Sequence, residues 1–170
     1  MLSRMYKSKR EKGFTIIEVL IVLAIAGLIM LVVFLAVPAL QRTSRNTQRT
    51  NDVAGVLGAM SEFINNNNGA LPTTASTDTA GKLTISSTVS GTNTSTANLG
   101  YYKSDGTSQP VSISGTAAGT TGVNGTNEET VTIYKGATCN TLGTQAINGP
   151  SRSIAAVFTL ETGSKQCKSS

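Results

Sequence analysis

Residues 13–41 read GFTIIEVLIVLAIAGLIMLVVFLAVPALQ, and the rest of the chain is much less apolar. Within this stretch, 19 consecutive residues from Val19 to Val37 carry no charged or polar side chain. A helix of that length extends about 28 Å at 1.5 Å per residue, which matches the hydrocarbon core of a bilayer. We therefore predict one membrane-spanning helix, called the apolar segment below and assigned to residues 14–40.

Five basic residues precede the apolar segment, and Glu11 is the one acidic residue among them. The five are Arg4, Lys7, Lys9, Arg10 and Lys12. Basic residues that flank a span stay on the cytoplasmic side, so we expect the N-terminus inside and the chain beyond Gln41 outside. From Gly13 onward the chain has nine basic and eight acidic residues. This balance leaves no basic surface for phosphate, and no specific nucleic-acid partner is predicted.

A secretory signal peptide also begins with a basic region followed by an apolar one, so it is an alternative interpretation. Its apolar region usually has about 7 to 15 residues, which is fewer than the apolar segment has. Such a peptide also ends at a small-x-small cleavage site, and Gln41 instead leads into another helical pattern. We therefore expect the apolar segment to remain in the mature protein.

An amphipathic stripe follows the apolar segment, with apolar residues at steps of three and four, as on one face of a helix. Its members are Val53, Val56, Leu57, Met60, Phe63 and Ile64. We expect this face to pack on the core of its own domain rather than to form a binding groove. Pro38 would kink a helix without ending it, so the sequence predicts one helix of about 50 residues from Phe14 to Ile64. Asn65–Asn68 and Gly69 would end it, because Asn and Gly tolerate the left-handed conformation.

The remaining hundred or so residues are dominated by Thr, Ser, Gly and Asn, with short β-prone islands between them. Strands are predicted at 82–89, 99–103, 111–114, 130–135 and 154–161, and loops at 73–81, 86–98 and 115–127. Alternating polar and apolar residues favour an antiparallel sheet with one solvent-exposed face. Its apolar content is too small for an independent core, so the stripe should complete the inner face.

The predicted fold is therefore α+β: a long N-terminal helix, membrane-spanning in its first half and amphipathic in its second, packed on a small antiparallel β-sheet head. The predicted parts are a basic leader at 1–13, the apolar segment at 14–40, an amphipathic continuation at 41–68 and the head at 69–170.

The chain contains no His and no Trp. Without His there is no Ser-His or Cys-His nucleophile pair and no His-containing zinc site. The carboxylates of the head are few and scattered, so we predict no catalytic residue, no cofactor and no metal.

Cys139 and Cys167 are the only cysteines, and both lie in the part of the chain expected outside. Cysteine pairs in exported proteins normally oxidise to a disulfide. A disulfide across such a loop would stabilise the fold by about 3 to 4 kcal/mol in the loop-entropy description. Reactive or metal-binding thiols are the alternative, although two Cys without His make a poor metal site.

Residues 12–20 read KGFTIIEVL. Together with the basic leader and the apolar length, they resemble the prepilin leader and N-terminal helix of the type IV pilin and pseudopilin family, over residues 1–64. The resemblance implies that a prepilin peptidase cuts between Gly13 and Phe14 and methylates the new amine of Phe14. A glycine lets the backbone approach the peptidase closely. The alternative is that Gly13 is only a flexible joint before a membrane anchor.

Glu18 is the only ionisable side chain between Phe14 and Gln41, and a carboxylate within a membrane indicates function. The resemblance implies that it pairs with the Phe14 amine of a neighbouring subunit during assembly, because either charge alone in an apolar filament core is costly. The alternative is a carboxylate that reaches the membrane interface at little cost.

Gly27 and Pro38 both weaken a helix, one through its backbone freedom and the other through a missing N–H. In the family that the chain resembles, a Gly and a Pro bracket a part of the helix that loosens on assembly. Gly27 fits that pattern, and Pro38 lies a few residues further along than the pattern has it. A disulfide that clamps a C-terminal loop onto the sheet is also typical of pilins, which favours a bridge between Cys139 and Cys167.

The resemblance implies a structural subunit of a type IV pilus, for attachment, surface motility or DNA uptake, and no enzyme. Its expected partners are other copies of itself and related pilins, the prepilin peptidase, the pilus assembly machinery and, before assembly, the membrane. It would lie in the cytoplasmic membrane first and in an extracellular pilus afterwards. The alternatives are a pseudopilin of a type II secretion system and a membrane-anchored extracellular enzyme.

Overall fold

A computed structural model describes residues 13–88, 92–116 and 129–170. The basic leader before Gly13 and most of the predicted loop at 115–127 lie outside these residues. The chain divides into two compact units, Met1–Gln41 and Arg42–Ser170, which are described separately below.

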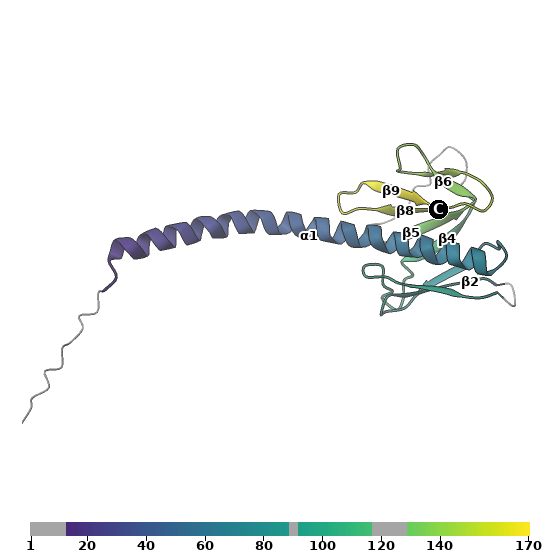
Figure 1. Ribbon diagram of the computed structural model, residues 1–170, viewed down its shortest axis with the longest axis horizontal. Helices are drawn as coiled ribbons and strands as arrows, with labels where there is room; N and C mark the ends of the chain where they lie inside the picture. Colours follow the sequence, from purple (N-terminus) through teal and green to yellow (C-terminus); the bar gives the residue numbers. More distant parts are fainter. Residues whose placement is uncertain (1–12, 89–91, 117–128) are drawn as a thin grey trace, which may run out of the picture. The chain divides into compact units, whose positions relative to one another are not determined.

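One helix, α1, runs from Ile16 to Asn66 and has 51 residues, with Pro38 inside it (Figure 1). The prediction of a single long helix is confirmed. It ends where Asn68 and Gly69 adopt positive φ angles of 54° and 85°, and the Gly69 N–H donates to the carbonyl of Ile64 at 2.8 Å. Asn and Gly adopt this conformation at low cost, so the run after α1 stops the helix as its sequence indicated.

The described strands of the head form three sheets. The first has β1 (Thr74–Thr77), β2 (Lys82–Ser86) and β3 (Ser95–Asn98), all antiparallel. The second has the order β4-β5-β8-β9, made of β4 (Val111–Thr116), β5 (Val131–Lys135), β8 (Ile154–Thr159) and β9 (Lys165–Ser169). The third is the hairpin of β6 (Ala137–Cys139) and β7 (Ala146–Asn148).

The pairing is antiparallel as predicted, except that β4 and β5 run parallel. The strand predicted at 99–103 is wrong, because the N–H groups of Gly100, Tyr101 and Tyr102 donate to the carboxylate of Asp52 and not to another strand. The segments 73–81 and 86–98, predicted as loops, contain β1 and β3. The sequence of β1 is Thr-Ala-Ser-Thr and that of β3 is Ser-Thr-Ala-Asn, so neither contains an apolar residue larger than Ala and neither shows an apolar alternation that would reveal it.

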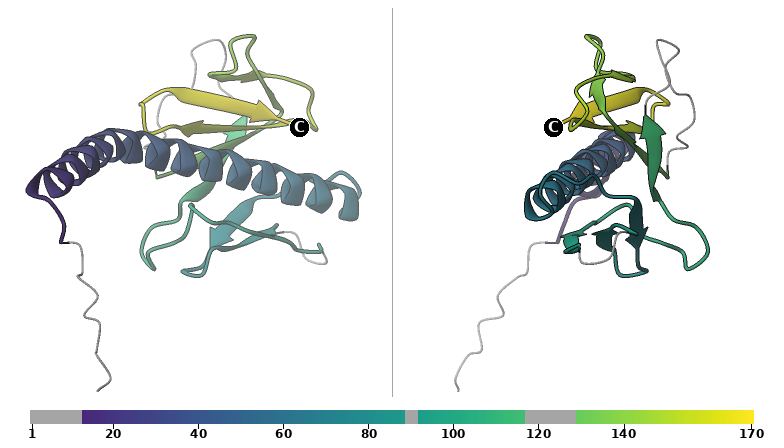
Figure 2. Two further views of the ribbon diagram at one scale, coloured as in Figure 1. Left: turned by 60° about the vertical axis from the view of Figure 1, so that its left-hand side comes forward. Right: turned by 90° about the vertical axis from the view of Figure 1, so that its right-hand side faces the viewer.

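Within the second unit, the C-terminal half of α1 lies between the β1-β2-β3 sheet and the β4-β5-β8-β9 sheet (Figures 1 and 2). The core joins the predicted stripe to both sheets, and its strand members include Leu83, Ile85, Val131, Ile133, Ala156 and Phe158. The stripe therefore completes the inner face of the head, as predicted. β8 is buried along its whole length, because Ala155 and Val157 on its other face pack in a second cluster with the β6–β7 hairpin.

Candidate functional site

The start of α1 is fixed by hydrogen bonds between Thr15 and Glu18. The Thr15 backbone N–H donates to Glu18 Oε2 at 2.8 Å, and the Thr15 hydroxyl donates to the same oxygen at 2.7 Å. The Glu18 N–H in turn donates to Thr15 Oγ1 at 3.4 Å. This reciprocal pair is a capping box, in which a Thr before the first helical turn and a Glu three residues on satisfy each other's free N–H groups. Gly13 and Phe14 therefore lie before the helix, and the Phe14 side chain is 87% exposed.

The apolar segment is exposed along its whole length. Its most hydrophobic window has a mean hydropathy of 3.3 and none of it is buried, which by length and composition suits a membrane span. Isolated exposed apolar residues are normal, but a continuous apolar surface marks contact with a membrane or another protein. Gly27 belongs to this surface, and a Cβ atom placed there would meet no atom within 4 Å.

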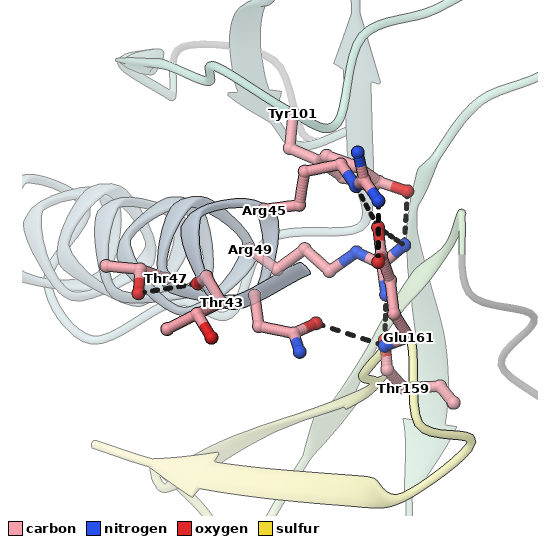
Figure 3. Close-up of polar contacts among 8 residues, drawn as sticks. Thr43, Arg45, Thr47, Arg49, Tyr101, Thr159 and Glu161 are labelled. Carbon is pink, nitrogen blue, oxygen red and sulfur yellow. Dashed lines mark hydrogen bonds and ion pairs between the residues drawn. The ribbon is translucent and has the colours of Figure 1, made fainter. Parts of the chain in front are cut away.

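In the head, three charged side chains join α1 to the end of β8 and the residues that follow it (Figure 3). Arg45 and Glu161 form a bidentate ion pair, with Arg45 Nη2 donating to Glu161 Oε2 at 3.0 Å. Arg49 Nη2 lies 3.8 Å from Glu161 Oε1, and Arg49 Nη1 donates to the Thr159 carbonyl at 3.1 Å. The hydrogen bond from Arg45 lowers the pKa of Glu161 below its usual value.

Arg49 is the largest fully buried side chain of the described residues, with 1% of its surface exposed. Its guanidinium lies 4.3 Å from the centre of the Tyr101 ring and also donates to the Tyr101 hydroxyl. A buried guanidinium is stable only with such compensation, here from a ring face, a carbonyl and a carboxylate.

Asp52 is buried one turn further along α1 and organises the loop after β3. Its two carboxylate oxygens accept the N–H groups of Gly100, Tyr101 and Tyr102 at 2.9, 2.6 and 3.1 Å. Three donors compensate the carboxylate for leaving water. The loop is therefore held on the helix by a charged side chain where a strand was predicted.

Reasoning from the sequence missed Arg45, Arg49, Asp52 and Glu161. The signal was present in part, because Arg45, Arg49 and Asp52 are four and three residues apart and so share one helix face that runs into the apolar stripe. Polar residues that continue an apolar stripe indicate burial. Their partners lie far away in the chain and carry no local pattern.

Cys139 in β6 and Cys167 in β9 form a disulfide. The bridge ties the β6–β7 hairpin to the edge of the four-stranded sheet, where the Cys167 N–H also donates to the carbonyl of Gly143 at 2.7 Å. The predicted disulfide is thus present. In the part of the chain that the structure describes, no group of three or more His, Cys, Asp or Glu side chains could hold a metal ion.

The capping box, the continuous apolar surface of α1 and the disulfide-bonded β head fit a membrane-anchored structural protein. A family model for the prokaryotic N-terminal methylation motif matches residues 8–34, and this motif is the class III leader of type IV pilins. The match supports the type IV pilin and pseudopilin family and points to a structural protein rather than an enzyme. No curated protein and no solved structure matches the chain.

The motif implies processing by a prepilin peptidase and assembly into a pilus or pseudopilus. Leader and apolar segment together fit a membrane-anchored pilin before assembly. The structure brings Gly13, Phe14 and Glu18 to one end of α1, while Gly27 and Pro38 lie inside the helix.

Proposed function

We propose that this protein is a structural subunit of a type IV pilus, which polymerises through α1 into an extracellular filament for adhesion, surface motility or DNA uptake. The observation that carries the proposal is the exposed apolar segment, most of which lies within the methylation motif at residues 8–34. Lipid covers such a surface before assembly, and equivalent helices of other copies cover it in a filament core.

The proposal assigns processing to Gly13 and Phe14. A prepilin peptidase removes residues 1–13, and the new amine of Phe14 is methylated. The basic leader holds this end of the chain at the cytoplasmic face, where the cut takes place.

The proposal assigns assembly to Phe14 and Glu18. Removal of the leader creates a positive charge at Phe14, and an unpaired cation in an apolar filament core is strongly destabilising. The Glu18 carboxylate of a neighbouring copy neutralises it. Gly27 and Pro38 give the helix the flexibility to adjust as copies pack, since one has no side chain and the other has no N–H.

Mass spectrometry of the N-terminus tests the processing step. We expect a mature chain that starts at methylated Phe14 with the apolar segment intact. A chain that starts near Gln41 would identify an ordinary signal peptide and contradict the proposal.

Immuno-electron microscopy of cells that produce the protein tests the assembly step. Antibody against the head should decorate long surface filaments, and cells lacking this chain should lose them or show fewer. The motif is shared with pseudopilins, so processed protein with no surface filament would assign the chain to a type II secretion pseudopilus instead.

A further inference from the structure

The hydrogen bonds at the start of α1 bear on how the leader is removed, and the inference drawn from them rests on the processing proposed above. In an α-helix each N–H donates to the carbonyl four residues earlier. The Glu18 N–H would therefore donate to the Phe14 carbonyl if the helix extended that far. It donates instead to Thr15 Oγ1. The Thr15 hydroxyl replaces the Phe14 carbonyl, and this replacement is what ends a helix at an N-cap residue.

The backbone before the N-cap residue Thr15 is therefore not part of the helix. Among the residues that the structure describes, no hydrogen bond uses the carbonyl of Gly13 or that of Phe14. In a longer helix the Gly13 carbonyl would accept the N–H of Ile17 and would be shielded by the first turn. Gly13 and Phe14 are also both exposed. The Gly13–Phe14 peptide bond is thus accessible, and its carbonyl carbon is the atom that a peptidase must attack.

We infer that Thr15 is a positioning residue for leader removal: its side chain, held by Glu18, starts α1 just after the scissile bond and keeps that bond out of the helix. In the cleavage, water adds across the bond. Its hydroxyl goes to the Gly13 carbonyl carbon, the bond from that carbon to the Phe14 nitrogen breaks, and the nitrogen takes up the proton. Thr15 contributes no group to this chemistry and acts only on the conformation of the substrate.

Within the capping box, the Thr15 hydroxyl is the group that takes the place of the Phe14 carbonyl. Thr15 Oγ1 accepts the Glu18 N–H and donates to the Glu18 carboxylate, so the hydroxyl makes bonds in both directions. Valine has the shape of threonine without the hydroxyl. With Val at this position the Glu18 N–H has no side-chain acceptor, and the acceptor that a continued helix offers it is the Phe14 carbonyl. The helix then extends backwards over the bond to be cut.

The test is a time course of leader removal from the full chain by a prepilin peptidase in membranes, followed by mass. Thr15→Val should be cut about fivefold more slowly, the factor that corresponds to the loss of an N-cap of ordinary strength. Thr15→Ser keeps a hydroxyl and should be cut at close to the wild-type rate. Thr47→Val is the matched control, because the Thr47 hydroxyl donates to the Thr43 carbonyl of the same helix, far from the cut. It should leave the rate unchanged.

A second measurement reads the conformation directly. Carbonyl ¹³C shifts of labelled Gly13 and Phe14, recorded for the uncut full chain in lipid bilayers, should move to helical values in Thr15→Val and stay non-helical in Thr15→Ser. Wild-type chain left uncut at this bond would overturn both the proposed processing and this inference. A cut wild type with equally fast cutting of Thr15→Val, or slow cutting with unchanged shifts, would overturn this inference alone.

Discussion

Glu18 combines two properties at the residue scale. It is the one ionisable side chain of the apolar segment, and its carboxylate is bonded to Thr15 of its own chain. A membrane anchor alone has no need of this charge, which costs up to about 3 kcal/mol at mid-bilayer and less near the interface. A filament subunit needs it once the Phe14 amine exists.

We therefore expect Glu18→Ala to be processed and to stay in the membrane at normal levels, because Thr15 still caps the helix. It should form few or no filaments as the only copy, since each contact would then bury an unpaired cation at a cost of about 3 to 5 kcal/mol. Counting filaments by electron microscopy checks this, with Glu18→Gln as the neutral variant of the same shape. Normal filament number and length in both would remove Glu18 from the assembly mechanism.

Asp52 holds the loop after β3 on α1, so its loss should destabilise the head. Asp52→Ala leaves the N–H groups of Gly100, Tyr101 and Tyr102 without their acceptor beside a buried helix face. Each lost bond of this kind costs about 1 kcal/mol or more, so unfolding free energy should fall by about 3 kcal/mol. Denaturant unfolding of the full chain in detergent measures it. Asp105→Ala is the control, because the Asp105 carboxylate accepts the N–H groups of Thr107 and Ser108 in its own exposed turn, and an equal loss there would contradict the assignment.

At the scale of elements, the ion pair of Arg45 with Glu161 holds α1 to the turn between β8 and β9. The lowered pKa of Glu161 means that the folded state favours its ionised form. The stabilisation is therefore present when the pH is above the usual carboxylate pKa. It is lost as the pH falls through the lowered pKa that Glu161 has in the folded state. Melting temperature followed from neutral pH into the acid range should decline more steeply in wild type than in Glu161→Gln. Parallel curves would exclude this pair as a source of the acid sensitivity.

The disulfide acts on the β6–β7 hairpin, which forms a sheet of its own among the strands that the structure describes. Reduction should lower the unfolding free energy by about 3 to 4 kcal/mol, given a loop that spans 28 positions. Unfolding with and without reductant measures the change, and the variant with Ser at both Cys139 and Cys167 should not respond to reductant. Two free thiols in protein taken from cells would contradict the bridge.

At the scale of the whole molecule, the two units have different sources of stability. The residues of the core and the disulfide all belong to Arg42–Ser170, whereas the apolar segment is exposed throughout. A chain that starts at Arg42 should therefore be a folded, soluble monomer with nearly the melting temperature of the full chain in detergent. Calorimetry and sedimentation test this, and aggregation or loss of a cooperative transition would show that the head depends on the apolar segment.

The sequence by itself determined the basic leader, the apolar segment, the single long helix, its end at Asn68 and Gly69, and the stripe that enters the core. Each of these depends on charges or periodicities within a few residues of one another, and such patterns can be recognised without knowledge of tertiary contacts. Only the tertiary structure decided that β3 lies before Leu99, that β4 runs parallel to β5 and that Arg49 is buried. Those features depend on contacts between residues distant in the chain, such as Val111 with Val131, Asp52 with Gly100 and Arg49 with Thr159. The free energy of such contacts exists only once packing has brought both partners out of water.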